Sequence, residues 1–400
     1  MRRIGRAAGA VAAAMLLTAC GGQPPETAEP VTTSGCMVSA PAGFADRSIG
    51  QLSFGEMSNA RSAGFLASTS SQRVSTTDGT GEALSRFAAA GCDLGALVGP
   101  GGADTLSAVA VDSPDTVWLA VATGGTDYPD NVVTIDFDLR EPAFIAGYSA
   151  AASSETGTVA IFASRGFAAG DALLAAFDAG VEQRNADAGT AVEVLRAGST
   201  ERRTVDDTQA AGREYTEDAL DAGADVIVPF ASGAASGVLE VFTAYYGIAD
   251  ADAAPDPTAV PDPAADGAAG AAEGDAAEEE PPFTPTLVWY GTDGSQTLGG
   301  VLGDHVIAST VPNVAAGFQS TVAGWPETGF AGELGEPPGD ERTIGDIAVR
   351  APEYTGTMDN GGVEIVATDG LLSSVAGLGR DIAEVRERIA EGEVEVPGAD

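Results

Sequence analysis

Short apolar runs rich in Val, Ile and Leu alternate along most of this chain with longer stretches in which Ala and Gly stand among polar residues. Such runs are typical of strands that a parallel sheet buries on both faces, and the stretches between them are typical of the helices that cover such a sheet. The first part of the chain therefore predicts one α/β series. Its expected strands are 36–39, 72–77, 92–98, 116–122 and 131–137, and its expected helices are 51–67, 82–90 and 102–112.

The same alternation starts again after an expected helix at 141–153. Two α/β series in one chain predict two lobes, each a parallel sheet flanked by helices, because right-handed crossovers allow few other arrangements. This is an α/β fold of the periplasmic-binding-protein type, a clamshell of two lobes. The later expected elements are strands 157–163, 191–197, 224–230, 286–292, 305–311 and 362–368 and helices 168–184, 206–222, 233–247, 313–324 and 380–392.

The late segments are expected to cross back between the lobes. We expect lobe 1 to hold 36–138 and about 294–325, and lobe 2 to hold 139–293 and about 326–400. One stretch, 249–283, departs from the alternation with ten acidic residues, six Pro and no basic residue. Such a composition buries too little apolar surface to offset the entropy of ordering, so we expect a disordered insertion within lobe 2.

The first twenty residues have the features of an export signal. Three Arg precede an apolar stretch that is too short to be a stable bilayer span, and the sequence LTAC follows, ending in Cys20. This order is similar to a bacterial lipobox, in which the Cys is acylated and becomes the first residue of the mature protein. A secretion signal with a chance Cys, or a membrane anchor, is the alternative. We expect a signal peptide at 1–19, a lipidated flexible tether at 20–35, and a location at the extracytoplasmic face of the cell membrane.

Acidic residues dominate the charged positions. The chain has 59 Asp and Glu against 19 basic residues, all of them Arg, for a net charge of −40. Such a surface repels nucleic acid and anionic lipid headgroups. We therefore expect no nucleic-acid partner, membrane contact only through the lipid anchor, and a monomer.

Two Cys remain after Cys20, and an oxidising compartment favours a bond between them. Cys36 opens the first expected strand and Cys92 opens the third. In a sheet with the strand order 2-1-3 these strands are parallel neighbours, which places both residues at the same end. We predict a Cys36–Cys92 disulfide, with two buried free thiols as the alternative.

No motif typical of a catalytic site is visible in the sequence. His305 is the only histidine, so a zinc site or a catalytic pair has no second member, and without Lys there is no phosphate-binding GxxxxGK motif. The Gly-rich stretch 99–104 fits either an anion-binding loop or a tight strand-to-helix turn. We expect no catalytic residue, no metal and no cofactor, and a protein that is not an enzyme.

Several short motifs together carry a resemblance to a known family. In order along the chain they are CMVSAPAGFADRSIGQLSF, GCDLGALVG, NVVTIDF, EPAFIAGYSAA, GADVIVPFASGAASG, VWYGTDGSQ, VIASTV and IAEGEVEVP. This set resembles the basic membrane protein (BMP) family of ABC-transporter substrate-binding lipoproteins over nearly all of 35–398. The resemblance implies a type I binding protein that delivers a purine nucleoside to a permease.

The ligand-binding positions of that family are largely replaced here. The Phe-Asn pair that stacks on the base and hydrogen-bonds it corresponds to Ile49 and Gly50, and the Asp expected after the fourth strand falls on Ala122 or Thr123. The loss of one stacking contact and of two or three hydrogen bonds removes on the order of 5–10 kcal/mol from the free energy of nucleoside binding. We therefore expect no nucleoside binding by the family's own contacts. Further replaced positions are Ala40, Ala45, Ser295 and Pro312.

The residues that remain at the strand ends are candidate contacts for another solute. Each also fits a structural role, such as packing for the Phe residues or helix N-capping for Asp293. We expect a substrate-binding lipoprotein of a BMP-type importer that closes on a small, differently substituted solute, with ABC permease subunits as partners. The alternative is a sensor or surface lipoprotein on the same fold with a degenerate pocket. The candidate ligand contacts are Phe44, Asp46, Ile49, Gly50, Thr123, Phe230, Ser232 and Asp293.

Overall fold

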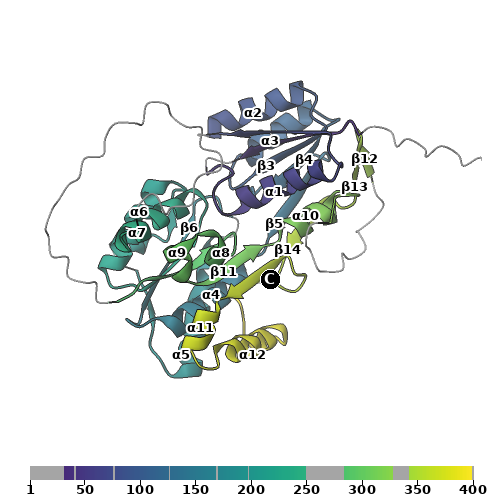
Figure 1. Cartoon of the computed structure of the whole chain (residues 1–400). Coiled ribbons are helices and arrows are strands. Elements are labelled where there is room, and N and C mark those ends of the chain that lie inside the picture. The colour runs from purple at the N-terminus through teal and green to yellow at the C-terminus, as the bar shows by residue number, and fades with distance from the viewer. Residues whose placement is uncertain are drawn as a thin grey trace, which may run out of the picture. The chain divides into compact units, whose positions relative to one another are not determined.

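The computed structural model describes residues 31–39, 42–74, 77–125, 127–167, 170–196, 198–248, 283–327 and 342–398. From Thr32 onward the chain forms one compact unit that contains two large sheets, each covered by helices (Figure 1). The expected signal peptide, Cys20, and most of the expected tether and acidic insertion lie outside the described residues. Within the described part of the chain, no helix combines the length and the apolar character needed to cross a membrane.

The first sheet has six parallel strands in the order β14-β5-β4-β3-β1-β2. Its elements are β1 Ser34–Ser39, α1 Ile49–Ser62, β2 Ser68–Arg73, α2 Thr77–Ala89, β3 Leu94–Val98, α3 Ala103–Asp112, β4 Val117–Val121, β5 Val132–Phe137, α10 Val314–Thr321 and β14 Glu353–Gly356. Side chains alternate between its faces: Met37 packs in a core with Met57 of α1, whereas Val38 packs with Leu84 of α2 and Leu106 of α3. The buried apolar runs thus form the centre of the sheet, as predicted.

The second sheet has the order β15-β11-β10-β9-β6-β7, with β8 also paired to β6 and with β15 as an antiparallel edge. Its strands are β6 Thr158–Ser164, β7 Glu193–Val194, β8 Thr204–Val205, β9 Val226–Phe230, β10 Thr286–Tyr290, β11 Val306–Pro312 and β15 Val363–Ala367. Its helices are α4 Arg140–Ser153, α5 Gly170–Ala188, α6 Gln209–Asp221, α7 Gly233–Tyr245, α8 Gly294–Thr297, α9 Gly300–Asp304, α11 Asp369–Ser374 and α12 Leu378–Ala390. The predicted α/β class, with two parallel sheets flanked by helices, is confirmed.

Glycines allow two helix pairs beside the second sheet to approach closely. A Cβ at Gly180 of α5 would lie 1.9 Å from the carbonyl oxygen of Phe144 in α4, and one at Gly212 of α6 would lie 1.9 Å from that of Ala234 in α7. No real side chain fits at such a distance. The pairs α4–α5 and α6–α7 therefore pack backbone against backbone at these positions.

The predicted lobe boundaries need correction. The stretch from about 294 to Pro312 was expected in lobe 1, but β11 pairs with β10 and belongs to the second sheet. The chain crosses only after Pro312, contributes α10 and β14 to the first sheet, and then returns to the second sheet as β15. An apolar run predicts a strand without indicating its sheet, because the choice depends on which neighbouring edge is open for pairing.

The sequence pattern also misplaced or missed several strands that contain few apolar residues. The strand expected at 72–77 lies at 68–73, and the one expected at 191–197 shrinks to Glu193–Val194. The sequence pattern missed β8, β14 and the small hairpin of β12 Arg342–Ile344 and β13 Ile347–Val349. These are short or polar segments, such as STSSQR in β2, whose pairing supplies the strand geometry that their composition does not indicate.

The predicted disulfide is confirmed. Cys36 in β1 and Cys92, just before β3, are bonded, with their Cα atoms 6.2 Å apart. The order β2-β1-β3 makes these strands parallel neighbours, as the prediction required. The bond ties the amino end of the first strand to the amino end of the third.

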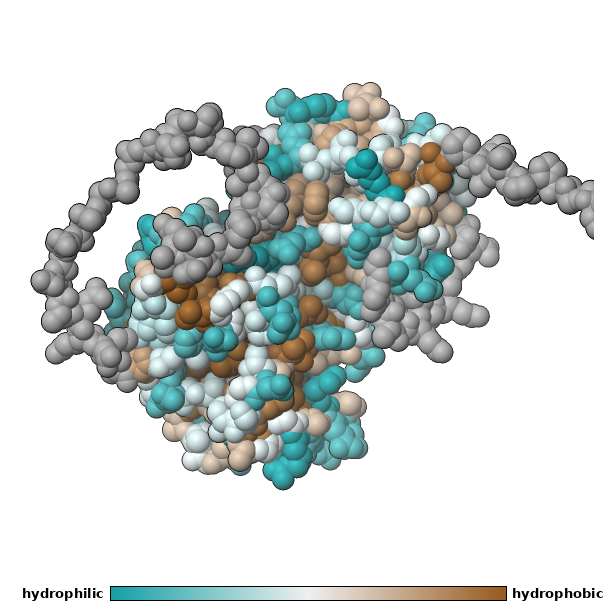
Figure 2. Space-filling model, in the orientation of Figure 1, coloured by the Kyte–Doolittle hydropathy of each residue, from teal (hydrophilic) through white to brown (hydrophobic). Residues whose placement is uncertain are grey.

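Apolar residues on the face shown in Figure 2 are interspersed with hydrophilic ones. Few large apolar side chains are exposed among the described residues, and these are Val31, Phe54, Val111, Val301 and Leu372. Most of the apolar surface is thus used inside the two lobes, where Trp118 and Trp289 are fully buried.

Candidate functional site

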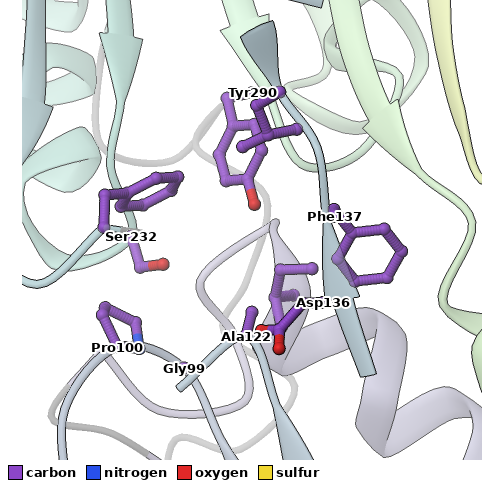
Figure 3. A pocket seen from close by; sticks show the side chains of 10 residues that line it. Gly99, Pro100, Ala122, Asp136, Phe137, Ser232 and Tyr290 are labelled. Carbon is purple, nitrogen blue, oxygen red and sulfur yellow. The ribbon is translucent and has the colours of Figure 1, made fainter. Parts of the chain in front are cut away.

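A pocket lies where carboxyl ends of strands from both sheets come together (Figure 3). Parallel α/β sheets bind their ligands at this edge. The cavity volume of this pocket is about 30 Å³. The lining residues are Ile49, Gly99, Pro100, Ala122, Asp136, Phe137, Leu139, Phe167, Ser232 and Tyr290.

Three polar side chains face this pocket: the Asp136 carboxyl, the Ser232 hydroxyl and the Tyr290 hydroxyl (Figure 3). Within the part of the chain that the structure describes, none of these three groups makes a hydrogen bond or an ion pair. Tyr290 is only 3% exposed, and its hydroxyl oxygen points toward the pocket. The three groups are therefore available to a ligand.

The pocket carries an acidic group and is partly shielded from water. Burial raises the pKa of the Asp136 carboxyl to about 6. Burial also raises the pKa of the Tyr290 hydroxyl, with a further contribution from the negative charge of Asp46. No Arg or His occurs among the described residues that line the pocket, and the chain has no Lys. The site thus offers a carboxyl group without a cation beside it.

Aromatic packing fixes the position of the Tyr290 ring. The Phe167 ring lies edge-on to it, with centroids 5.2 Å apart, and the Phe230 ring lies at 5.6 Å. Such contacts are worth about 0.5–1.5 kcal/mol each beyond burial. The phenol is therefore held with its oxygen toward the pocket, as Figure 3 shows.

The backbone is strained where β4 ends at the pocket. Ala122 has a φ of +50°, a left-handed conformation that costs an L residue about 1–2 kcal/mol. Its N–H donates to the carbonyl of Ile135 at 2.8 Å, which holds the turn against β5. Strain of this kind clusters at ligand sites. The Asp136 carboxyl lies beside Ala122 at this end of the pocket (Figure 3).

Of the residues predicted as ligand contacts, Ile49 and Ser232 line the pocket. The others lie outside its lining, and their roles as ligand contacts stay predictions. Phe230 packs behind Tyr290, while the Thr123 hydroxyl lies 2.5 Å from that of Tyr128. Structural partners thus account for the positions of both residues.

Asp46 caps the first helix. Its carboxylate accepts the backbone N–H groups of Ser48, Gly50 and Gln51 at 3.0, 3.0 and 2.9 Å. Burial nevertheless raises the pKa of this carboxyl to about 6, since desolvation outweighs the three hydrogen bonds. Gly50 fits here because a Cβ at its position would lie 2.2 Å from the carbonyl oxygen of Gly43.

The remaining candidates also have local partners. The rings of Phe44 and Phe54 lie 5.4 Å apart. Asp293 caps α8, accepting the N–H of Ser295 at 3.1 Å and its hydroxyl at 2.6 Å. His305 stacks on Tyr246 with ring centroids 3.9 Å apart, and burial lowers the pKa of its imidazole. These contacts fix the positions of the Phe44, Asp293 and His305 side chains.

The sequence analysis missed Asp136, Phe167 and Tyr290 as pocket residues. A usable signal for Asp136 was present, because an acidic residue near the carboxyl end of a buried apolar strand is costly unless it has a use. For Phe167 and Tyr290 no local signal existed, since aromatic residues at strand ends usually belong to the core.

Two helix-covered sheets with one pocket at their strand ends define the class of two-lobed, clamshell binding proteins. Solved structures share this fold. A solute-binding protein of an ABC transporter system from Aeropyrum pernix K1 is 16% identical, covering 92% of this chain and 94% of its own at a TM-score of 0.60. A corresponding protein from Conexibacter woesei is 15% identical, covering 92% and 99% at 0.51. A transcriptional activator of the comK gene from Bacillus halodurans is 14% identical, covering 89% and 96% at 0.53.

Family membership rests on sequence. The model of the family described as ABC transporter substrate-binding protein PnrA-like (Bmp) matches residues 34–243, and the chain belongs to this family. No curated protein sequence matches the chain significantly. The predicted family is thus confirmed, and the chain is the substrate-binding protein of an ABC transporter system, a class that binds solutes outside the cytoplasm.

Proposed function

We propose that this chain is the lipid-anchored substrate-binding protein of a BMP-type ABC importer, and that it binds a small solute in the pocket between the two sheets. The observation that carries the proposal is the set of three polar groups at the strand ends that face the pocket and have no partner among the described residues: Asp136, Ser232 and Tyr290. Acylated Cys20 holds the protein at the extracytoplasmic membrane face, where it delivers the solute to permease subunits as a monomer.

A purine nucleoside is a poor candidate for that solute. Ile49 lines the pocket at a position where the resemblance implies a base-stacking aromatic residue, and Gly50 faces the backbone of Gly43. The cavity volume of about 30 Å³ is enough for only a few water molecules. A bulky bicyclic base would need the wall residues to move, without the stacking energy that offsets such a change.

The same small volume favours the alternative, a sensor or surface lipoprotein with a degenerate pocket. The two candidates differ in whether the native protein carries a solute. Native mass spectrometry of the full chain, freshly purified without denaturation, separates them. We expect one small solute per chain. Absence of any bound mass would support the alternative.

A matched pair of variants tests the location. Ser232→Trp fills the pocket beside α7 and is expected to abolish the bound mass. Ser236→Trp places the same bulk on the exposed side of α7 and is expected to retain it. Equal retention in both variants would contradict the proposed site.

Thermal-shift measurements test the exclusion of nucleosides. We expect inosine, guanosine and adenosine to leave the Tm of the full chain unchanged, because tight binding to the native state would raise it. A rise of several degrees with any of them would show that the replaced contacts have been compensated.

A further inference from the structure

The Asp136 carboxyl is the charged group of the pocket, and its neighbours leave it exposed to whatever enters. It lies near the carboxyl end of β5, where its register partner is Thr355 of β14. The nearest acid along the chain, Asp138, is paired with Arg140 at 2.8 Å, so that Arg is already engaged. Figure 3 shows the Asp136 carboxyl beside Ala122, on the side of the pocket opposite Tyr290.

An unpaired carboxylate in a partly dry pocket selects against most solutes. An anionic solute is repelled, and a neutral solute shields the half-buried charge from water without supplying a counterion, which is costly. A cation pairs with it directly. Burial alone keeps the pKa of this carboxyl raised, and a bound cation would reverse that effect.

The rest of the lining suits an organic cation rather than a hydrated metal ion. The Tyr290 and Phe167 rings form an aromatic corner of the kind that attracts ammonium groups. The Tyr290 and Ser232 hydroxyls can each accept an N–H hydrogen bond. Isoleucine, leucine and proline side chains supply apolar surface for a short carbon chain. No cluster of three metal-ligating residues occurs in the described ranges.

We propose that the pocket recognises a small primary alkylammonium solute, with its ammonium group paired to Asp136 and hydrogen-bonded by Ser232 and Tyr290. This inference rests on the proposed function, since it names the class of solute that the same site carries. The net charge of −40 also favours a cationic solute, because it raises the local concentration of cations around the protein.

The inference is tested with three probes of one carbon skeleton: propylamine, which is cationic at neutral pH, propan-1-ol and propanoate. Thermal shift and titration calorimetry of the full chain are expected to detect propylamine alone. Asp136→Asn is expected to weaken propylamine binding by at least about tenfold, since it removes the counterion. A similar response to all three probes, or an unchanged response in Asp136→Asn, would overturn the inference.

Asp136→Asn has a second expected effect that does not require ligand. Removing an unpaired, half-buried charge should raise the Tm of the ligand-free protein by about 1–3 °C at neutral pH. The matched control is Asp138→Asn, which breaks the ion pair with Arg140 and is expected to lower the Tm while leaving the propylamine response intact. A purely structural Asp136 would instead lose stability on substitution.

The pH dependence follows from the sign of the shift. The pKa of Asp136 is about 6 in the folded protein and 3.8 as its ordinary value, so the native state binds more protons between these values and loses stability as the pH rises through this window. Propylamine binding should strengthen over the same rise. The other titratable groups around the pocket are Tyr128, Tyr290 and Asp46. Burial raises the pKa of both tyrosines, and Asp46 titrates near 6, so the wild-type profile is compared with that of Asp136→Asn.

The outcomes separate the two proposals. Native mass spectrometry could detect a bound solute that carries no amine, while propylamine gives no thermal shift and no calorimetric signal. That result would contradict the ammonium inference and leave the proposed function standing. No bound solute, no probe response and no effect of Ser232→Trp would end both.

Discussion

Replacing Cys36 and Cys92 together by Ala lowers the free energy of unfolding by about 4 kcal/mol, which is the loss expected for a closed loop of this length. The bond links positions 56 residues apart and joins β1 to the start of β3. Its absence restores the entropy of that loop to the unfolded chain. Both residues are buried, so Ala replaces them without exposing a polar group. Guanidinium unfolding in a Cys20→Ser background measures the difference.

Two controls accompany this measurement. Reducing agent should destabilise the parent protein by a similar amount and should not affect the double Ala variant. A thiol assay on the unfolded, unreduced parent should find no reactive sulfur in the Cys20→Ser background. Two titratable thiols, or a loss below about 1 kcal/mol, would be incompatible with a disulfide that stabilises the first lobe.

Gly180→Ala is expected to destabilise the second lobe by about 3 kcal/mol, because the added methyl group cannot be accommodated between α4 and α5. Its Cβ would lie 1.9 Å from the Phe144 carbonyl oxygen and 3.0 Å from the Tyr148 nitrogen, and both are backbone atoms that move only with the helix. The helices must separate, which loosens the core around Phe177. Urea unfolding monitored by circular dichroism measures the loss.

Gly55→Ala provides the matched control. Gly55 also lies inside a helix, α1, but a Cβ there meets nothing within 4 Å. The substitution should therefore stabilise the protein by about 0.5–1 kcal/mol through helix propensity alone. The same Gly-to-Ala substitution is thus expected to lower the stability at one site and to raise it at the other. Equal effects at both would mean that backbone contact does not determine the response.

Stability and ligand binding oppose each other at the pocket. The half-buried Asp136 carboxyl and the Tyr290 hydroxyl have no partner among the described residues, and Ala122 adopts a left-handed backbone. The unpaired polar groups and the left-handed backbone each cost stability in the ligand-free protein, although the Tyr290 ring itself packs in the core. Several destabilising features close together are expected at a ligand-binding site, because the bound ligand supplies the interactions that the free protein lacks.

Much of the architecture follows from the sequence alone. Apolar runs of β-branched residues predict the central strands, and their alternation with Ala-rich stretches predicts two helix-covered parallel sheets, because these patterns reflect burial within each segment. The family motifs and the Cys36–Cys92 pairing follow as well, since both depend on the order of residues and on a common strand order. The resemblance also indicates that the nucleoside contacts are replaced. Ile49, which stands where the resemblance implies a base-stacking residue, lines the pocket.

Only the tertiary structure decided which distant residues meet. Asp136 on β5 and Tyr290 on β10 belong to different sheets, and nothing in either segment indicates that they line one pocket. The same holds for β11, whose sheet depends on an open edge, and for polar β2, which is a strand because β1 pairs with it. The capping of α1 by Asp46 also depends on the folded backbone, which brings three N–H groups within its reach. Periodicity encodes local burial, whereas pairing and the composition of a site depend on contacts between segments far apart in the chain.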